Sequence, residues 1–293
     1  MIFGFFLGKK KPKISEYIAR PLIRFGIPLS VMGLLLKEGI DINLVKIAAL
    51  AFFLIGFLIV LINIFPILKK RLPNYTLQLA GLIGNTSFLG IPIAKALFPD
   101  TETINFTIGF DLGTTLFAWI FGPFFLQEKS QNKNIPNIKG LLNALINSPA
   151  SRGIIGVLVV YLFKIDGILG NYLWIPSRIV IAFAIIIVGT RLGLITNQKS
   201  KIFDLNEEIK FSILLKLLIL PLVIFLISKF LRFDFYQSSA VILQAGTPTA
   251  ISTILMAEAY GIKQKIASKI LFTSTLISIF TIPLLTIFRT ALR

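Results

Sequence analysis

Long apolar stretches alternate with short polar connections along the whole chain. Segments of 17 to 25 mainly apolar residues suit the hydrocarbon core of a bilayer, which is about 30 Å thick. Nine such segments can be drawn, at residues 20–36, 44–68, 75–97, 103–126, 141–163, 175–195, 209–231, 236–257 and 266–288. The pattern predicts an all-α polytopic membrane protein with about nine transmembrane helices.

Two of these segments contain residues that interrupt a helix. In the third, the stretch from Gly84 to Pro92 combines two glycines, a proline and three small polar side chains. A helix interior loses about 1 kcal/mol per Gly and about 3 kcal/mol per Pro relative to Ala. The eighth segment has a similar stretch from Gln244 to Thr253. A broken backbone in hydrocarbon survives only where protein or a water-filled cavity satisfies its polar groups, so paired breaks indicate a central binding site.

The two breaks also suggest an internal repeat. We expect a first repeat of four helices over residues 1–126, a cytoplasmic linker over 127–140, and a second repeat of five helices over 141–293. The broken segments would start on opposite sides of the membrane, so the repeats would be inverted. The counterpart of residues 141–163 would then be missing at the start of the chain or reduced to Met1–Gly8, which we expect to be an interfacial or frayed start.

Charge is scarce and confined to the connections. Of 293 residues, 55% are hydrophobic and 15% charged, and 30 Lys and Arg residues against 13 Asp and Glu residues give a net charge of +17. The cations flank apolar runs, without a basic stripe in a polar region, so nucleic acid is not an expected partner. Fourteen connection cations fall on one side of the predicted membrane and six on the other. This bias predicts a cytoplasmic N-terminus in a multi-pass protein of the cell (inner) membrane.

Several kinds of chemistry are excluded by composition. The chain contains no Cys and no His, which rules out thiolate and imidazole metal sites, Cys nucleophiles and His-based triads. A Gly-x-x-x-x-Gly-Lys-Ser/Thr phosphate loop is also missing, which disfavours an ATP-driven pump. Asp111 and Asp166 are the only conceivable carboxylate pair of an intramembrane enzyme, and Asp166 lies in the predicted loop 164–167. We expect neither an enzyme nor a cofactor.

Motifs around both breaks resemble those of a known family. They are Asn85-Thr86, Gly90-Ile91-Pro92 and Lys95-Ala96 in the first half, with Pro248-Thr249-Ala250 and Ala257-Glu258-Ala259-Tyr260-Gly261 in the second. The sequence resembles the auxin efflux carrier family of permeases, whose members include plant PIN-formed auxin exporters and bacterial dicarboxylate carriers. The resemblance implies two inverted five-helix repeats, a panel that moves against a scaffold, and two helices that cross at their breaks. Members usually have ten spans, and here the first helix is missing or reduced.

The breaks supply the candidate substrate-binding residues. Half-helix N-termini carry unpaired amides and about half a positive charge each, which favours a carboxylate. The Asn85 amide can donate two hydrogen bonds, and threonine hydroxyls can donate one each. The candidates are Asn85, Thr86, Gly90, Pro92, Thr247, Pro248, Thr249 and Thr253. Alternatively, Gly90 and Pro92 form an ordinary kink, and Asn85 holds a neighbouring helix.

Asp111 is the candidate ion-coupling residue. It lies well inside the fourth apolar segment, where a carboxylate costs at least about 3 kcal/mol unless it is protonated, paired or facing water. It therefore couples transport to a proton or sodium ion, or it serves as a structural partner of a nearby Thr or of Lys95.

The sequence predicts a secondary permease for small organic anions, with a passive channel or a non-transporting scaffold as the alternatives. It leaves the oligomeric state open, and a homodimer is among the assemblies that fit.

Overall fold

All the regular elements that the structure describes are helices. The computed structural model describes residues 2–10, 17–18, 21–98, 100–127, 149–197, 205–259 and 263–291. Four helices are long and apolar enough to cross a membrane: Ile42–Ile64, Glu102–Gly122, Glu207–Phe230 and Lys265–Ala291. Thr86–Leu97 and Ser151–Leu162 are shorter apolar helices. The prediction of an all-helical membrane protein is confirmed, and the count of about nine spans stays a prediction.

The chain forms two compact units, each built from two separate segments of the sequence. Unit 1 comprises Met1–Asp41 with Ile135–Lys201, and unit 2 comprises Ile42–Asn134 with Ile202–Arg293. Each unit thus combines a segment of the predicted first repeat with a segment of the second. Most of the predicted linker 127–140 lies outside the described residues.

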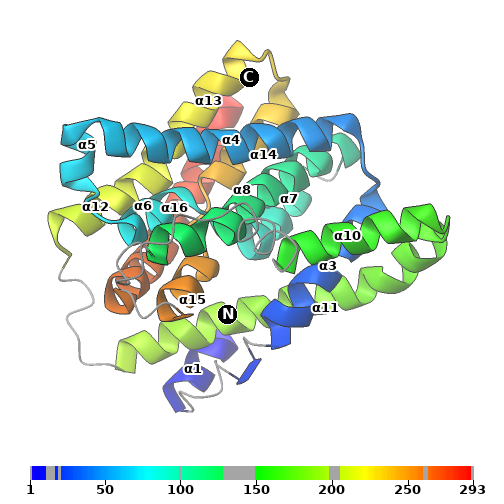
Figure 1. Ribbon diagram of the computed structural model, residues 1–293, viewed down its shortest axis with the longest axis horizontal. Coiled ribbons are helices and arrows are strands. Elements are labelled where there is room, and N and C mark those ends of the chain that lie inside the picture. Colours follow the sequence, from blue (N-terminus) through cyan, green and yellow to red (C-terminus); the bar gives the residue numbers. More distant parts are fainter. Residues whose placement is uncertain are drawn as a thin grey trace. The chain divides into compact units, whose positions relative to one another are not determined.

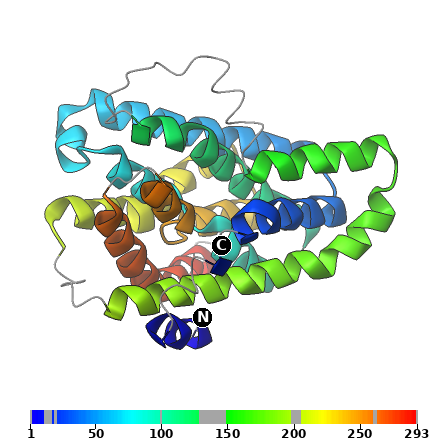
Figure 2. The ribbon, with the colours of Figure 1, turned by 60° about the horizontal axis from the view of Figure 1, so that its bottom comes forward.

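Unit 1 is a small group of closely packed helices. Its elements are α1 (Ile2–Lys10), η1 (Leu22–Gly26), α3 (Ile27–Glu38), α10 (Pro149–Leu162) and α11 (Asp166–Asn197). Figure 2 shows α3 (blue) beside both α10 (green) and α11 (yellow-green). Gly33 permits this approach, because a Cβ there would lie 2.7 Å from the Cβ of Ser177.

Two local features of unit 1 bear on the sequence predictions. Residues 2–10 form helix α1, which packs on α11, so this stretch is not frayed, while its interfacial position stays a prediction. Gly8 of α1 lies so close to the backbone of Thr190 that a Cβ has no room. Asp166 is the first residue of α11 and not part of a loop, because a carboxylate in the first turn favours the positive end of a helix.

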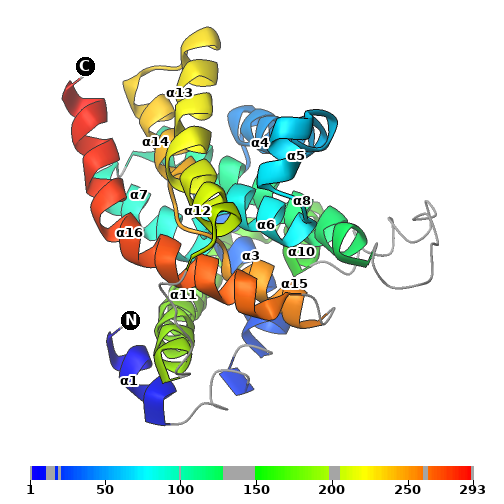
Figure 3. The same cartoon turned by 90° about the vertical axis from the view of Figure 1, so that its left-hand side faces the viewer.

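Unit 2 holds both broken segments. Its elements in the first half are α4 (Ile42–Ile64), α5 (Pro66–Arg71), α6 (Tyr75–Leu82), η2 (Thr86–Gly90), α7 (Ile91–Leu97) and α8 (Thr101–Gln127). Those in the second half are α12 (Glu207–Leu214), η3 (Leu215–Ile219), α13 (Leu220–Phe230), α14 (Phe235–Ala245), α15 (Ile251–Ala259) and α16 (Gln264–Ala291). Helix α4 lies along α8 (Figure 1), and α16 passes α12, α14 and α15 (Figure 3).

Helix α4 shows how an apolar helix divides its surface between core and lipid. Ile47, Ala51 and Ile55 recur every four residues and are at most 2% exposed, so they form a stripe against the core. Phe53 and Phe57, on the other side, are 71% and 58% exposed. A large exposed apolar surface of this kind is expected where a helix faces hydrocarbon and not water.

Candidate functional site: the crossing of the two broken helices

Both interruptions are present, but they are shorter than the sequence suggested. Helix α6 ends at Leu82 and the next helical turn starts at Thr86, while α14 ends at Ala245 and α15 starts at Ile251. Gly90 and Pro92, which we expected within the break, belong to helical turns. Pro92 lies inside the continuous helix Thr86–Leu97, directly after the wide π-helical turns of η2, and local π adjustments of this kind re-satisfy the backbone groups that a proline frees.

The two interruptions meet through their backbones. Gly84 and Thr249 form an isolated antiparallel β-bridge. The amide of Asn85 donates to the carbonyl of Pro248 at 2.7 Å, and the amide of Ala250 donates to the carbonyl of Ile83 at 3.0 Å. Polar groups freed by one break are therefore satisfied by the other, which is what an unwound backbone in a membrane requires.

Glycines allow the two segments to come this close. A Cβ at Gly84 would overlap the Thr247 hydroxyl and would lie 2.7 Å from the Nζ atom of Lys216. A Cβ at Gly90 would overlap the side chain of Gln244. A larger residue at either position would have to displace these side chains.

Three threonines, two in the second break and one in the first turn of α15, hold the backbone. The hydroxyls of Thr247, Thr249 and Thr253 donate to the carbonyls of Gln244, Ala80 and Ala250 at 2.7, 2.7 and 2.6 Å. A hydroxyl has a single hydrogen to donate. In this conformation these three side chains therefore have no donor left for a carboxylate. The carbonyl of Pro248 accepts from the amide of Asn85.

Asp111 stands at the N-terminal end of the turn that follows the first break. It extends from α8, is 6% exposed, and its Oδ1 atom accepts hydrogen bonds from Thr86 and Ser87 at 2.5 and 2.6 Å. The Thr115 hydroxyl lies 3.5 Å from the same oxygen. The N-terminal end of a helical segment is its positive end. The structure thus places this carboxylate against hydroxyl donors, among them the predicted site residue Thr86.

Lys216 lies beside Gly84 of the first break and was not foreseen from the sequence. It belongs to η3, is 1% exposed, and its Nζ atom donates to the carbonyl of Ala245 at 2.6 Å. Ala245 is the last residue of α14, hence the negative end of that half-helix. The sequence signal was a single Lys inside the apolar run from Ile213 to Ile219.

Asn85 differs from the other predicted site residues. Its backbone carbonyl accepts from the amides of Leu89 and Gly90, both at 3.1 Å. Its side chain is 4% exposed, and its carboxamide makes no hydrogen bond to any part of the chain that the structure describes. Two amide hydrogens at the centre of the crossing are therefore available to a ligand.

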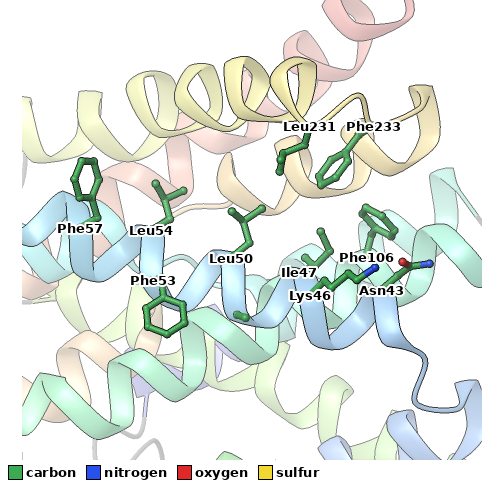
Figure 4. Close-up of a pocket in the computed structure, with 11 residues that line it drawn as sticks. Asn43, Lys46, Ile47, Leu50, Phe53, Leu54, Phe57, Phe106, Leu231 and Phe233 are labelled. Carbon is green, nitrogen blue, oxygen red and sulfur yellow. The ribbon is translucent and has the colours of Figure 1, made fainter.

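The threonines at the crossing are buried, and three cavities of unit 2 lie away from it. Thr247 and Thr249 are 0% exposed. A cavity of about 590 Å³ runs along α4, with Asn43 and Lys46 at one end and apolar side chains such as Leu50 and Phe57 along its length (Figure 4). Another of about 380 Å³ lies between α12–α13 and α16. A polar one of about 220 Å³ lies at the start of α6. Within the described residues, none of these three is lined by a residue of either break.

Comparisons with known proteins point to membrane transport. A family model described as membrane transport protein matches residues 153–286, which include α14, the second break and α15. An uncharacterized transporter from Methanocaldococcus jannaschii is 23% identical over 229 residues, covering 76% of this chain and 70% of that protein. The family is one of transporters and not of enzymes, as the sequence predicts. The chain is thus similar to membrane transport proteins, and its motifs at Asn85 and Pro248 resemble those of the auxin efflux carrier family.

Proposed function

We propose that this protein is a secondary permease that moves small organic anions, such as auxin-like or dicarboxylic acids, by alternating access at the crossed breaks. The observation that carries the proposal is the pair of donors that flank Gly84. These are the carboxamide of Asn85, which is not engaged by the described chain, and the ammonium group of Lys216.

The charges around the crossing favour an anion on the side where Lys216 lies. Asp111 already neutralises the positive end of η2. The N-terminal end of α15 lacks such a carboxylate among its described hydrogen-bond partners, and Lys216 uses one of its three N–H donors on Ala245. An ammonium group, a free carboxamide and a helix N-terminus together suit a carboxylate.

For alternating access, the buried residues around Asn85 have to become accessible from each side of the membrane in turn. The proposed membrane topology has about nine spans in two inverted repeats, residues 1–126 and 141–293, joined by the linker 127–140. Its N-terminus is on the cytoplasmic side of the cell (inner) membrane.

Asp111 is the proposed ion-coupling residue. The side chain is buried at the crossing and surrounded by the hydroxyls of Thr86, Ser87 and Thr115. Oxygen atoms of this kind can surround a hard cation such as sodium, and a carboxylate can equally bind a proton. Either ion would compete for the hydrogen bonds that hold η2 in place, which would link ion binding to the conformation of the break.

The function is tested by counterflow in proteoliposomes with a labelled dicarboxylate or a labelled indole carboxylate. A panel of organic acids is first screened for thermal stabilisation of the purified protein, since a ligand of the folded state raises its apparent stability. We expect saturable exchange that Asn85→Ala abolishes. Asn171→Ala is the matched control, because its exposed side chain accepts from Lys37 in unit 1.

The competing functions give different results in the same assay. Flux that rises in proportion to substrate concentration without saturation would indicate a passive channel. A protein that binds none of the acids and shows no flux would be a scaffold. Saturable exchange that survives Asn85→Ala would keep the carrier function and remove the crossing from its substrate site.

A further inference from the structure

A second polar site lies at the other end of α6, away from the crossing. A cavity of about 220 Å³ is enclosed there by the end of α4, by α5, by the first turn of α6 and by the end of α8. Its lining includes Lys69, Asn74, Thr76 and Lys263. From Thr76 to Gly84, α6 and the break span about 12 Å at 1.5 Å per residue, so this cavity is distinct from the crossing.

Two buried donors of this cavity have no partner in the described chain. Thr76 is 3% exposed, and neither its Oγ1 atom nor the Nδ2 atom of Asn74 has a hydrogen-bond partner there. The Oδ1 atom of Asn74 caps α6 by accepting from the amide of Leu77 at 3.1 Å, which fixes the carboxamide so that its nitrogen is the free end. Buried donors of this kind normally have partners, so their position in a polar cavity indicates a ligand with acceptor atoms.

The charge of the cavity is positive. Lys69 and Lys263 are exposed lysines at its lining, and none of the described lining residues is acidic. Two ammonium groups with a hydroxyl and a carboxamide match an oxyanion. A phosphate group offers several strong acceptor oxygens together with negative charge.

The surroundings indicate a membrane surface as the source of that phosphate. The cavity lies where α4 and α8, two helices of membrane-spanning length, come to an end. The rings of Tyr75 and Phe125 stack beside it at a centroid distance of 4.8 Å, and aromatic residues are enriched at membrane interfaces. The bias of the connection cations assigns this end to the cytoplasm, where acidic lipids concentrate and basic pockets between helices bind their headgroups.

We propose that this cavity binds the phosphate group of an acidic phospholipid, with Lys69 and Lys263 as the counter-charges and Thr76 and Asn74 as the buried donors. Because α6 runs from the cavity to the crossing, the bound headgroup fixes the end of α6 that is opposite the break. This site is independent of the anion that is transported, and its test needs no transport substrate.

The experiment measures thermal unfolding of the purified full chain in detergent micelles. The micelles contain phosphatidylglycerol, phosphatidylcholine or no lipid, and separate arms add inorganic phosphate or glycerol phosphate. We expect phosphatidylglycerol to raise Tm, and phosphatidylcholine to raise it much less. The double variant Lys69→Gln/Lys263→Gln should lose this difference. The matched control Lys70→Gln/Lys265→Gln should keep it, since it removes the same charge from residues that do not line the cavity.

A further variant separates ligand binding from folding. Thr76→Val replaces an unpartnered buried hydroxyl with a methyl group, so without lipid its Tm should be unchanged or higher. With phosphatidylglycerol, its rise in Tm should be smaller than that of the unaltered protein.

Each other outcome overturns part or all of the proposal. Equal stabilisation by phosphatidylcholine, or equal loss in the two double variants, would show that the cavity does not select phosphate charge. Full stabilisation by inorganic phosphate or glycerol phosphate alone, with no further gain from the lipid, would overturn the lipid as the source and assign the cavity to a soluble phosphate. A Thr76→Val protein that keeps the full lipid effect would remove the buried donors from the site.

Discussion

The Nζ atom of Lys216 donates a hydrogen bond of 2.6 Å to the carbonyl oxygen of Ala245, the last residue of α14. On the other flank of the first break, Asp111 accepts hydrogen bonds from Thr86 and Ser87 at the start of η2. A buried cation thus faces the negative end of one half-helix, and a buried carboxylate faces the positive end of another. The two charges stabilise helix ends that hydrocarbon would otherwise leave unsolvated.

Replacement of Lys216 tests whether its charge serves the substrate. Lys216→Met keeps an unbranched side chain of similar length but removes the ammonium group. The Ala245 carbonyl then lacks this donor, which costs about 1–3 kcal/mol of folding free energy. Removal of a buried charge offsets that cost. We therefore expect a small change in Tm together with at least a tenfold loss of dicarboxylate counterflow.

The control for this change is Lys210→Met, an exposed lysine in the preceding turns that bonds Glu207. It should retain full counterflow. If Lys216→Met were to transport at the rate of the unaltered protein, Lys216 would be a structural residue that only caps α14.

Substitution of Gly90 tests the packing of the two broken helices. In Gly90→Ala the new methyl group overlaps the side chain of Gln244, and overpacking of a buried site costs about 1–3 kcal/mol. We expect a lower Tm for the purified protein. Gly167→Ala is the matched control, because it adds a Cβ in α11 with no atom within 4 Å; its Tm should not fall. Equal Tm values for the two variants would contradict the close packing at Gly90.

The sequence was sufficient to predict an all-helical fold and the neighbourhood of both breaks. Apolar length predicts a helix, and Gly and Pro predict where it is interrupted. The exact limits could not be predicted, because they depend on contacts between segments. The first break ends at Asn85 because the amide of this residue donates to the carbonyl of Pro248, which is far away in the sequence. The chain then resumes a helix in the turns around Gly90.

The roles of polar residues at the site were harder to predict. Thr249 looked like a donor for a substrate, yet its hydroxyl bonds the carbonyl of Ala80. Lys216 looked like one more residue of an apolar segment, and only its contact with Ala245 gives it a place at the crossing. Hydrogen-bond partners are set by tertiary structure, whereas residue type shows only which bonds a side chain can make.

Membrane topology can be checked with reporter fusions. The bias of connection cations predicts that a reporter attached after Lys13 lies in the cytoplasm. With about nine spans, a reporter attached after Arg293 should lie on the opposite side. A matched pair of activity reporters, one active only inside and one only outside, measures both positions. The same side for both fusions would show that the number of spans is even.

Replacement of Asp111 tests ion coupling. Asp111→Asn keeps an oxygen that can accept from Thr86 and Ser87, so the protein should fold, but the side chain can no longer bind a proton or carry a negative charge. We expect transport of the labelled acid to lose its dependence on a pH gradient, or on sodium where sodium is the coupling ion, while exchange without a gradient persists. The measurement is uptake into proteoliposomes with and without a pH gradient, in sodium and in choline buffers. Asp166→Asn, at the start of α11, is the control and should leave the gradient dependence unchanged. Unchanged gradient dependence in Asp111→Asn would assign Asp111 to holding η2 alone.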